Sequence, residues 1–136
     1  MSESLGESFL DPDASRDYLR SWQQRVEQNA ARTQAMSDQL ARLRTTAKDG
    51  NDLAEVTIDS TGVLLNLELT DRIRRFEPDV VARAVMTALR EARTKAAERS
   101  REIAVETMGP DSLTARTVAD RMSLLLERPG AAEGEL

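Results

Sequence analysis

The chain has 136 residues, a formal net charge of −5 and 32% charged residues, which fits one domain whose surface is dense in both signs. It contains no histidine and no cysteine, which excludes disulfides, thiolate metal sites and catalysis by the usual general base. No apolar run approaches the roughly 18 residues of a membrane span, and the start of the chain does not resemble a signal peptide, so we expect a soluble, cytoplasmic protein.

A long amphipathic helix is predicted after a polar, acidic tail at residues 1–11. Pro12 and the acids beside it suit a first helical turn, and neither proline nor glycine follows before about Thr46. A seam recurs along this helix at alternating spacings of three and four, formed by Leu19, Trp22, Val26, Asn29, Thr33, Met36, Leu40, Leu43 and Ala47. A helix of about 34 residues is roughly 50 Å long, which exceeds a compact domain of this size. We therefore expect part of it to project, with the seam packed on a second chain or on this chain's own second helix.

A β-hairpin is predicted over Leu53 to Leu69, after a turn at residues 48–52 that ends the helix. Alternating apolar residues define one face of each strand: Ala54, Val56 and Ile58 in the first, and Val63, Leu65, Leu67 and Leu69 in the second. Gly62 supplies the positive φ that suits a three-residue loop between them. The sequence shows no second clear hairpin, and two strands alone are marginal in water. We expect helices to cover this hairpin and the hairpin of a second copy to continue its sheet.

A second long helix follows a connector, residues 70–76, that carries three arginines in four positions. Proline and acids at residues 77–79 favour a helix start, and Gly109-Pro110 ends the helix. Its apolar stripe, rich in alanine and therefore open to close packing, consists of Val81, Ala84, Val85, Ala88, Leu89, Ala92 and Ala96. Arginines 83, 90 and 101 fall together on the opposite side, and nearby glutamates dilute their charge.

A third, short helix is predicted from a cap at Asp111 or Ser112 to about Glu127. Its apolar side is expected to carry Leu113, Val118, Met122, Leu125 and Leu126. The predicted fold class is therefore α+β, with a long N-terminal helix, an antiparallel hairpin or small sheet, a second long helix and a short C-terminal helix.

This order of elements resembles the YbaB/EbfC family of bacterial nucleoid-associated proteins over about residues 16–104. The resemblance lies in the hairpin sequence Glu-Val-Thr-Ile-Asp-Ser-Thr-Gly-Val-Leu and, for actinobacterial members, in the Trp22 helix, the Thr46–Gly50 entry and the Ala88-x-x-x-Ala92-x-x-x-Ala96 helix. It implies a homodimer whose sheets join across the two-fold axis and whose long helices form arms. It also implies DNA binding with little sequence preference, linked to nucleoid organisation and gene regulation. Similar small proteins accompany type VII secretion loci, which suggests a scaffold or chaperone role as the alternative.

Four segments follow from the pattern and the resemblance together: a flexible tail at 1–11, a dimerisation and DNA-binding domain at 12–108, an extra helix at 109–128 and a disordered acidic tail at 129–136. An incomplete sheet and an overlong heptad helix also favour a second chain, and closed two-fold dimers are the commonest solution. The residues expected in the dimer contact are Met36, Leu40, Val56, Ile58, Leu65, Leu67, Val85 and Leu89.

Double-stranded DNA in the nucleoid is the first expected partner, because arginines neutralise phosphates without any histidine or metal. The candidate DNA-binding residues are Arg72, Arg74, Arg75, Arg83, Arg90, Arg93 and Lys95, with Arg25, Arg32, Arg42 and Arg44 as further cations. Arginine outnumbers lysine 17 to 2, which suits phosphate recognition, although codon usage and pairing with nearby acids explain the same ratio. The acidic net charge argues against this partner.

A protein-interaction module is the second expectation: a dimeric scaffold or chaperone whose helices grip another protein. The acidic balance, the heptad seam and the extra C-terminal helix favour it. Leu19 and Trp22 would then anchor a client, although ordinary packing within the seam is the simpler explanation for Trp22. An enzyme is not expected, because the chain lacks a glycine-rich phosphate loop and a nucleophile elbow, and no cofactor or metal is expected either.

Overall fold

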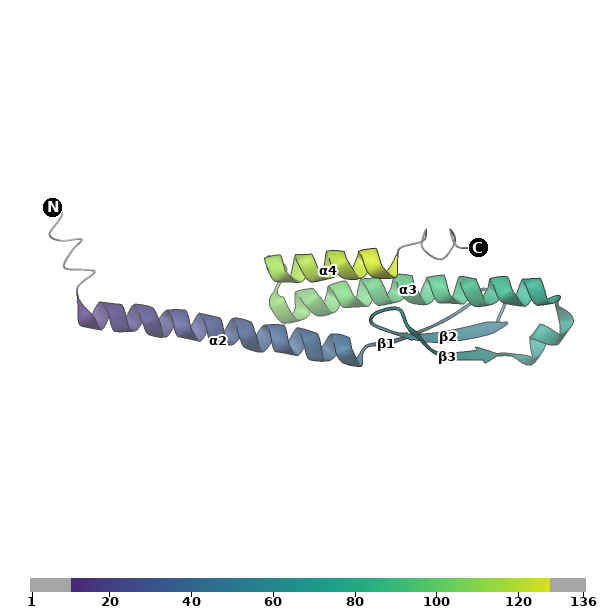
Figure 1. The fold of residues 1–136 in the computed structure, drawn as a ribbon, viewed down its shortest axis with the longest axis horizontal. Coiled ribbons are helices and arrows are strands. Elements are labelled where there is room, and N and C mark those ends of the chain that lie inside the picture. Colours follow the sequence, from purple (N-terminus) through teal and green to yellow (C-terminus); the bar gives the residue numbers. More distant parts are fainter. Residues whose placement is uncertain (1–10, 128–136) are drawn as a thin grey trace. The chain divides into compact units, whose positions relative to one another are not determined.

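The computed structural model describes residues 11–127, which form an α+β fold of the predicted class. Its elements are α2 (Pro12–Arg42), β1 (Arg44–Lys48), β2 (Ala54–Asp59), β3 (Leu64–Leu69), the 3₁₀ helix η1 (Asp71–Arg75), α3 (Pro78–Met108) and α4 (Leu113–Leu126) (Figure 1). The chain divides into two compact units, one up to Gln34 and one from Ala35 onward. The tails predicted at residues 1–11 and 129–136 lie outside the described residues, except for Asp11.

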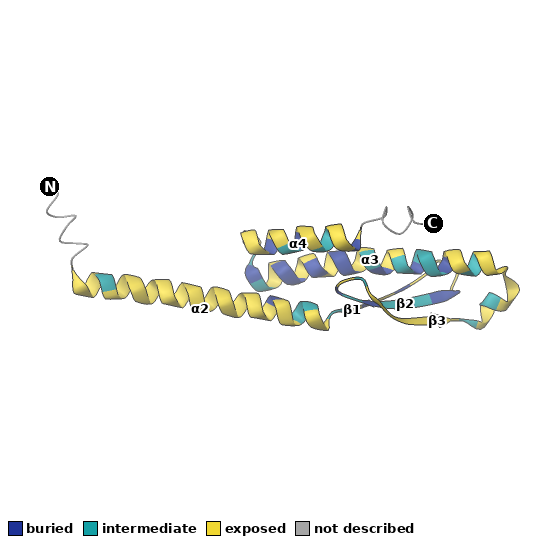
Figure 2. Ribbon diagram, viewed as in Figure 1, coloured by how far each residue is buried: buried dark blue, intermediate teal, exposed yellow. Residues whose placement is uncertain are grey.

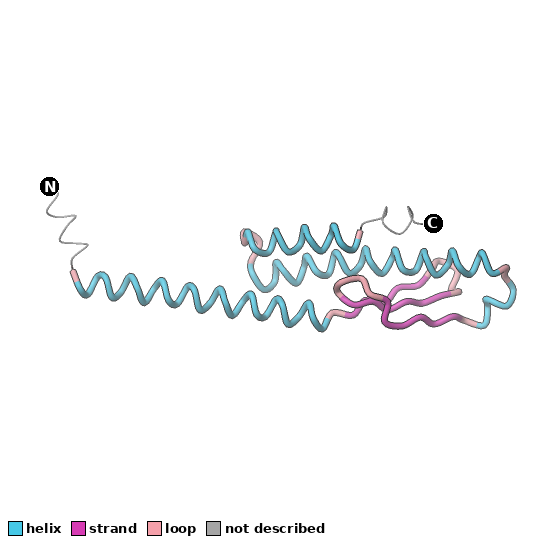
Figure 3. Tube along the Cα trace, viewed as in Figure 1, coloured by secondary structure: helices cyan, strands magenta, loops and turns pink. Residues whose placement is uncertain are grey.

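The sheet has three antiparallel strands in the order β1-β2-β3, which confirms the small sheet predicted as the alternative to a hairpin alone (Figure 3). The additional strand β1 uses residues that were assigned to the end of the first helix, which stops at Arg42 instead of about Thr46. The Arg44 guanidinium donates to the carbonyls of Ala41 at 3.2 Å and Leu43 at 2.9 Å, and these bonds cap the helix end. Ala47 fits the heptad spacing in the sequence, but it does not belong to the helix. It is buried as a residue of β1.

The turn at residues 49–53 joins β1 to β2, so it does not end a helix as predicted. The Asp49 carboxylate accepts hydrogen bonds from the backbone N–H groups of Leu53 and Ala54, both at 2.8 Å, and of Asn51 at 3.2 Å. Burial raises the pKa of Asp49, but these backbone donors outweigh it and hold the pKa below its ordinary value. Asp49 is therefore the acceptor around which the turn is built.

The predicted hairpin is confirmed as β2 and β3, with Gly62 at φ +88° in the connecting loop. The Asp59 carboxylate closes this loop by accepting from the Thr61 hydroxyl at 2.7 Å, the Thr61 N–H at 2.9 Å and the Val63 N–H at 3.0 Å. The bond from the Thr61 hydroxyl is the main reason why the pKa of Asp59 lies below its ordinary value. The register shifts within the pair, so that Ile58 lies opposite Leu64.

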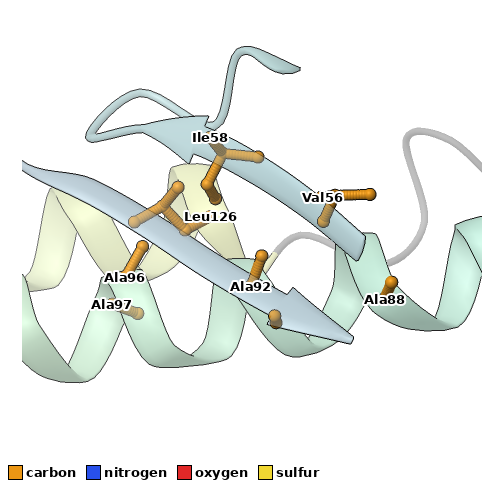
Figure 4. Packing of buried hydrophobic residues seen from close by; sticks show 8 residues of the cluster. Val56, Ile58, Ala88, Ala92, Ala96, Ala97 and Leu126 are labelled. Carbon is orange, nitrogen blue, oxygen red and sulfur yellow. The ribbon is translucent and has the colours of Figure 1, made fainter. Parts of the chain in front are cut away.

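A ridge of small side chains lets α3 lie close to the sheet. Every fourth residue is buried, in the series Ala84, Ala88, Ala92, Ala96, Ser100, Ala104 and Met108. Four residues turn an α-helix by about 400°, so each step of the ridge drifts about 40° around the axis. The first half therefore packs on Val56 and Ile58 of β2 (Figure 4), and the second half packs on helices. The stripe predicted on the second helix is thus confirmed.

The second half of the predicted seam packs on the chain's own second helix, which is one of the two arrangements expected. Met36 of α2 is buried with Ile103, Ala104 and Met108 of α3, and Leu40 and Leu43 pack against the same cluster. Ala115 of α4 completes it. This cluster lies entirely within the unit that starts at Ala35.

Helix α4 lies along α3, and its bounds agree with the prediction (Figure 1). Ser112, rather than Asp111, caps it, because the Ser112 hydroxyl accepts from the Ala115 N–H at 3.2 Å. The predicted apolar side is wrong for Leu113 and Leu125, which are 77% and 54% exposed. The ridge of α3 is met instead by small residues of α4, Ala115 and Ala119, and by Leu126 at the helix end.

Candidate nucleic-acid interface

Three of the predicted DNA-binding arginines lie on η1, a helix of five residues that directly follows β3. Thr70 holds the start of η1, since its N–H donates to the Leu53 carbonyl at 3.0 Å and its hydroxyl to the Asp52 carbonyl at 2.7 Å. Ile73 is half-buried and packs against the cluster of Leu53, Ala54 and Ala84. Arginines 72, 74 and 75 are all exposed around this anchored residue. None of the three forms an ion pair with another residue between 11 and 127.

The cations on α3 do not form a single face. Arg83 and Arg90 are exposed and lie about 20° apart around the helix, since seven residues make almost two turns. Arg83 is also 3.3 Å from the Asp79 carboxylate in an exposed ion pair. Lys95 is exposed about 120° away from Arg83, and Arg93 is half-buried beside the β2–β3 loop. The structure therefore groups Arg83 with Arg90 and separates both from Lys95.

The charge of the chain is unevenly distributed along its sequence. Residues 71–95 contain seven cations and four acids, which gives this segment a net charge of +3. Since the whole chain carries −5, the remaining residues carry −8. A locally basic segment on an acidic chain concentrates positive potential at η1 and the first half of α3.

The sequence profile of the YbaB/EbfC DNA-binding family matches residues 18–110. The chain belongs to the YbaB/EbfC DNA-binding family. Membership confirms the resemblance drawn from the hairpin and the alanine-rich helix, and it assigns the chain to DNA-binding, nucleoid-associated proteins and not to a family of enzymes. No curated protein matches the chain.

The family match ends at residue 110, so α4 lies beyond it. In this YbaB/EbfC protein, α4 engages a cation of α3, because the Arg101 guanidinium donates to the Ser123 hydroxyl at 2.7 Å. Arg99 is engaged by acids instead, at 3.0 Å from Glu102 and 3.2 Å from Glu106. The hydrogen bond that Arg99 donates to Glu102 is the largest of the effects that raise the pKa of Arg99. In the second half of α3, Arg99 is therefore paired with acids and Arg101 is hydrogen-bonded to α4, and this half lies beyond the basic segment.

An apolar face is left open on β3 of the YbaB/EbfC fold (Figure 2). All six residues of this strand are exposed, including Leu64, Leu65, Leu67 and Leu69 at 41–48%. Leu67 and Leu69 lie opposite Val56 and Ala54, whose side chains point toward α3. Because α3 packs on β1 and β2, these leucines point to the helix side of the sheet without a helix above them.

The predicted dimer residues fall into three groups. Leu65 and Leu67 belong to the open face of β3, whereas Val56 and Ile58 are fully buried within the chain's own core. Val85 and Leu89 are half-buried on α3, and Met36 and Leu40 lie in the cluster between α2 and α3. The predicted dimer set left out three further exposed apolar residues, Leu64 and Leu69 of β3 and Phe76 after η1. The sequence signal that could have identified Leu64 and Leu69 is the leucine-rich sequence of β3, in which apolar and polar residues do not alternate strictly.

None of the helices between residues 11 and 127 has both the length and the apolar content of a membrane span.

Proposed function

We propose that the chain binds double-stranded DNA in the nucleoid as a homodimer, mainly through arginine–phosphate contacts and with little sequence preference. The observation that carries this proposal is the set of exposed arginines 72, 74 and 75 on η1, which have no acidic partner in the described part of the chain. Guanidinium groups bind phosphate oxygens through two parallel hydrogen bonds, and an unpaired guanidinium need not first break an ion pair. Phosphate contacts carry no sequence information, which accounts for the low selectivity.

The open face of β3 supports the homodimer. A terminal strand with an unpaired edge and four exposed leucines is a surface that monomers rarely leave in water. Pairing of β3 with β3 of a second copy would join the two sheets and place leucines of the two strands side by side, where they cover one another in part. A dimer also doubles the number of basic segments, so that phosphates at two places along the duplex are neutralised together. We infer that regulation of gene expression follows from this occupancy of DNA.

The test is fluorescence anisotropy of a labelled duplex, titrated with the protein at several salt concentrations. Wild-type affinity should fall steeply with salt. Alanine at arginines 72, 74 and 75 should lower the slope of log K against log salt by up to about 0.9 for each phosphate that the variant no longer neutralises. Two duplexes of equal length and different sequence should bind alike.

The matched control carries alanine at Arg99, Arg101 and Arg116, which removes the same charge from α4 and the second half of α3, outside the basic segment. Equal reductions of affinity in both triple variants would show that only net charge matters and that η1 does not bind the duplex. An unchanged salt slope in the η1 variant, with native circular dichroism, would refute the proposed site.

A further inference from the structure

Four large apolar side chains are exposed on one side of α2 within the unit that ends at Gln34. Tyr18 is 66% exposed, Leu19 55%, Trp22 51% and Val26 48%. Projected at about 100° per residue, the four span about 100° of the helix circumference. We call this set the α2 stripe. Ordinary packing of Trp22 was the simpler expectation, but the chain itself leaves about half of this side chain in contact with solvent.

The composition of the α2 stripe is that of a binding surface. The whole chain has only four aromatic residues, and two of them, Tyr18 and Trp22, lie on this one stripe. Neither contributes to the clusters that form the core, which are built from alanine, aliphatic residues and methionine. Tyrosine, tryptophan and arginine are the residues that most often dominate the energy of protein–protein contacts. Tyr18 and Trp22 therefore lie outside the core clusters, at exposed positions where aromatic side chains would contribute strongly to the free energy of binding a partner.

The charges beside the α2 stripe have a single sign. Arg25 lies about 20° from Tyr18 around the helix and one turn after Trp22, and Arg32 continues the same side of the helix beyond Val26. Neither forms an ion pair with any residue that the structure describes. The acids of this unit's helix, Asp13, Asp17 and Glu27, lie at least about 80° from every residue of the stripe. A partner on this side thus meets apolar and aromatic groups bordered by positive charge alone.

A second copy of this helix does not complement that border. Antiparallel pairing of the two stripes places Arg25 opposite Leu19 of the other copy, and parallel pairing places Arg25 beside Ala30, so neither direction supplies an acid to Arg25. DNA does not complement it either, because hydrated phosphates leave the apolar groups uncovered. An amphipathic helix with leucine or other aliphatic residues on one side and glutamate or aspartate along its borders would cover the apolar side chains and pair with the arginines.

We infer that the α2 stripe is a docking site for an acidic amphipathic helix of another protein. This site gives the scaffold or chaperone role a physical form, with Tyr18, Leu19, Trp22 and Val26 as anchors and the two arginines selecting for acidic clients. It is separate from DNA binding, since the cations of η1 and α3 lie in the other unit.

The probe is a fluorescein-labelled peptide of four heptads with leucine at the a and d positions and glutamate at e and g. A second peptide with lysine at e and g serves as its counterpart. The acidic peptide should bind the full-length protein, and Trp22→Ala should weaken it by about 30-fold, the effect typical of a hot-spot aromatic. Charge reversal at both positions, Arg25→Glu with Arg32→Glu, should weaken it by about tenfold and should create binding of the lysine peptide.

The matched control reverses Arg20 and Arg42, which lie on the same helix at least about 100° from every residue of the stripe, and should leave acidic-peptide binding unchanged. Equal binding of both peptides to the wild type, or no binding of the acidic peptide by a protein with native circular dichroism, would overturn the inference. Loss of self-association in Trp22→Ala, measured by sedimentation, would also overturn it, because a second copy would then be the occupant. None of these outcomes depends on whether duplex DNA binds to η1.

Discussion

Replacing Leu126 with alanine should destabilise the protein by about 3–5 kcal/mol, although this residue lies outside the segment that matches the family. Leu126 is 2% exposed and belongs to the cluster between the sheet and α3 (Figure 4). Its neighbours on α3 include Ala92 and Ala96, which have no longer side chain that could turn into a void. Leucine-to-alanine changes cost about 2–5 kcal/mol, with the larger values where the site cannot collapse, so the upper part of that range applies here.

Leu124→Ala is the matched control, because Leu124 lies on the same helix and is 73% exposed. It should change the free energy of unfolding by less than about 0.5 kcal/mol. Both variants would be unfolded with urea and followed by circular dichroism at one protein concentration, since the proposed dimerisation would make apparent stability concentration-dependent. If Leu126→Ala is no less stable than Leu124→Ala, then α4 is an appendage and not a part of the core.

Two further changes address the interface and the turns. Leu67→Asp places a charge on the open face of β3 and should shift the protein toward monomer in sedimentation, whereas Leu124→Asp should not; a dimer of unchanged stability in Leu67→Asp would argue for another interface. The pKa of Asp49 is lowered by folding, so its contribution to stability is complete above the unfolded-state value near 3.9 and is lost as the pH falls below it. Urea midpoints at about pH 6 and about pH 3 should therefore differ less in Asp49→Asn than in the wild type, and an equally large difference would exclude this role for Asp49.

Local signals in the sequence determined where most elements begin and end. Pro12 and Pro78 each open a helix, and Gly62 adopts the positive φ that its place in the hairpin loop suggested. The four-residue spacing of alanines on α3 predicted a buried stripe, which the sheet and then the helices cover. These features need only backbone geometry and neighbouring residues, so they can be read without knowing the fold.

Contacts between distant residues decided the rest. The residues of β1 fit the heptad spacing of the preceding helix, and only pairing with β2, at Thr45 opposite Ile58, makes them a strand. The burial of Leu126 and the exposure of Leu124 and Leu125 depend on which side of α4 meets the alanine ridge of α3. The candidate DNA-binding site was likewise only partly predictable. The sequence marked the arginines of η1 as candidates, and the fold showed which cations are paired with other residues.

The sequence alone thus determined the elements, the family resemblance and a basic segment around η1 and α3. Only the tertiary structure decided that β3 keeps four leucines exposed and that Val56 and Ile58, predicted for the dimer contact, are buried in the chain's own core. The physical reason is that an amphipathic pattern predicts which side chains are buried but does not identify the surface that buries them. Which surface covers it depends on the area that α3 can reach, and α3 packs on only two of the three strands.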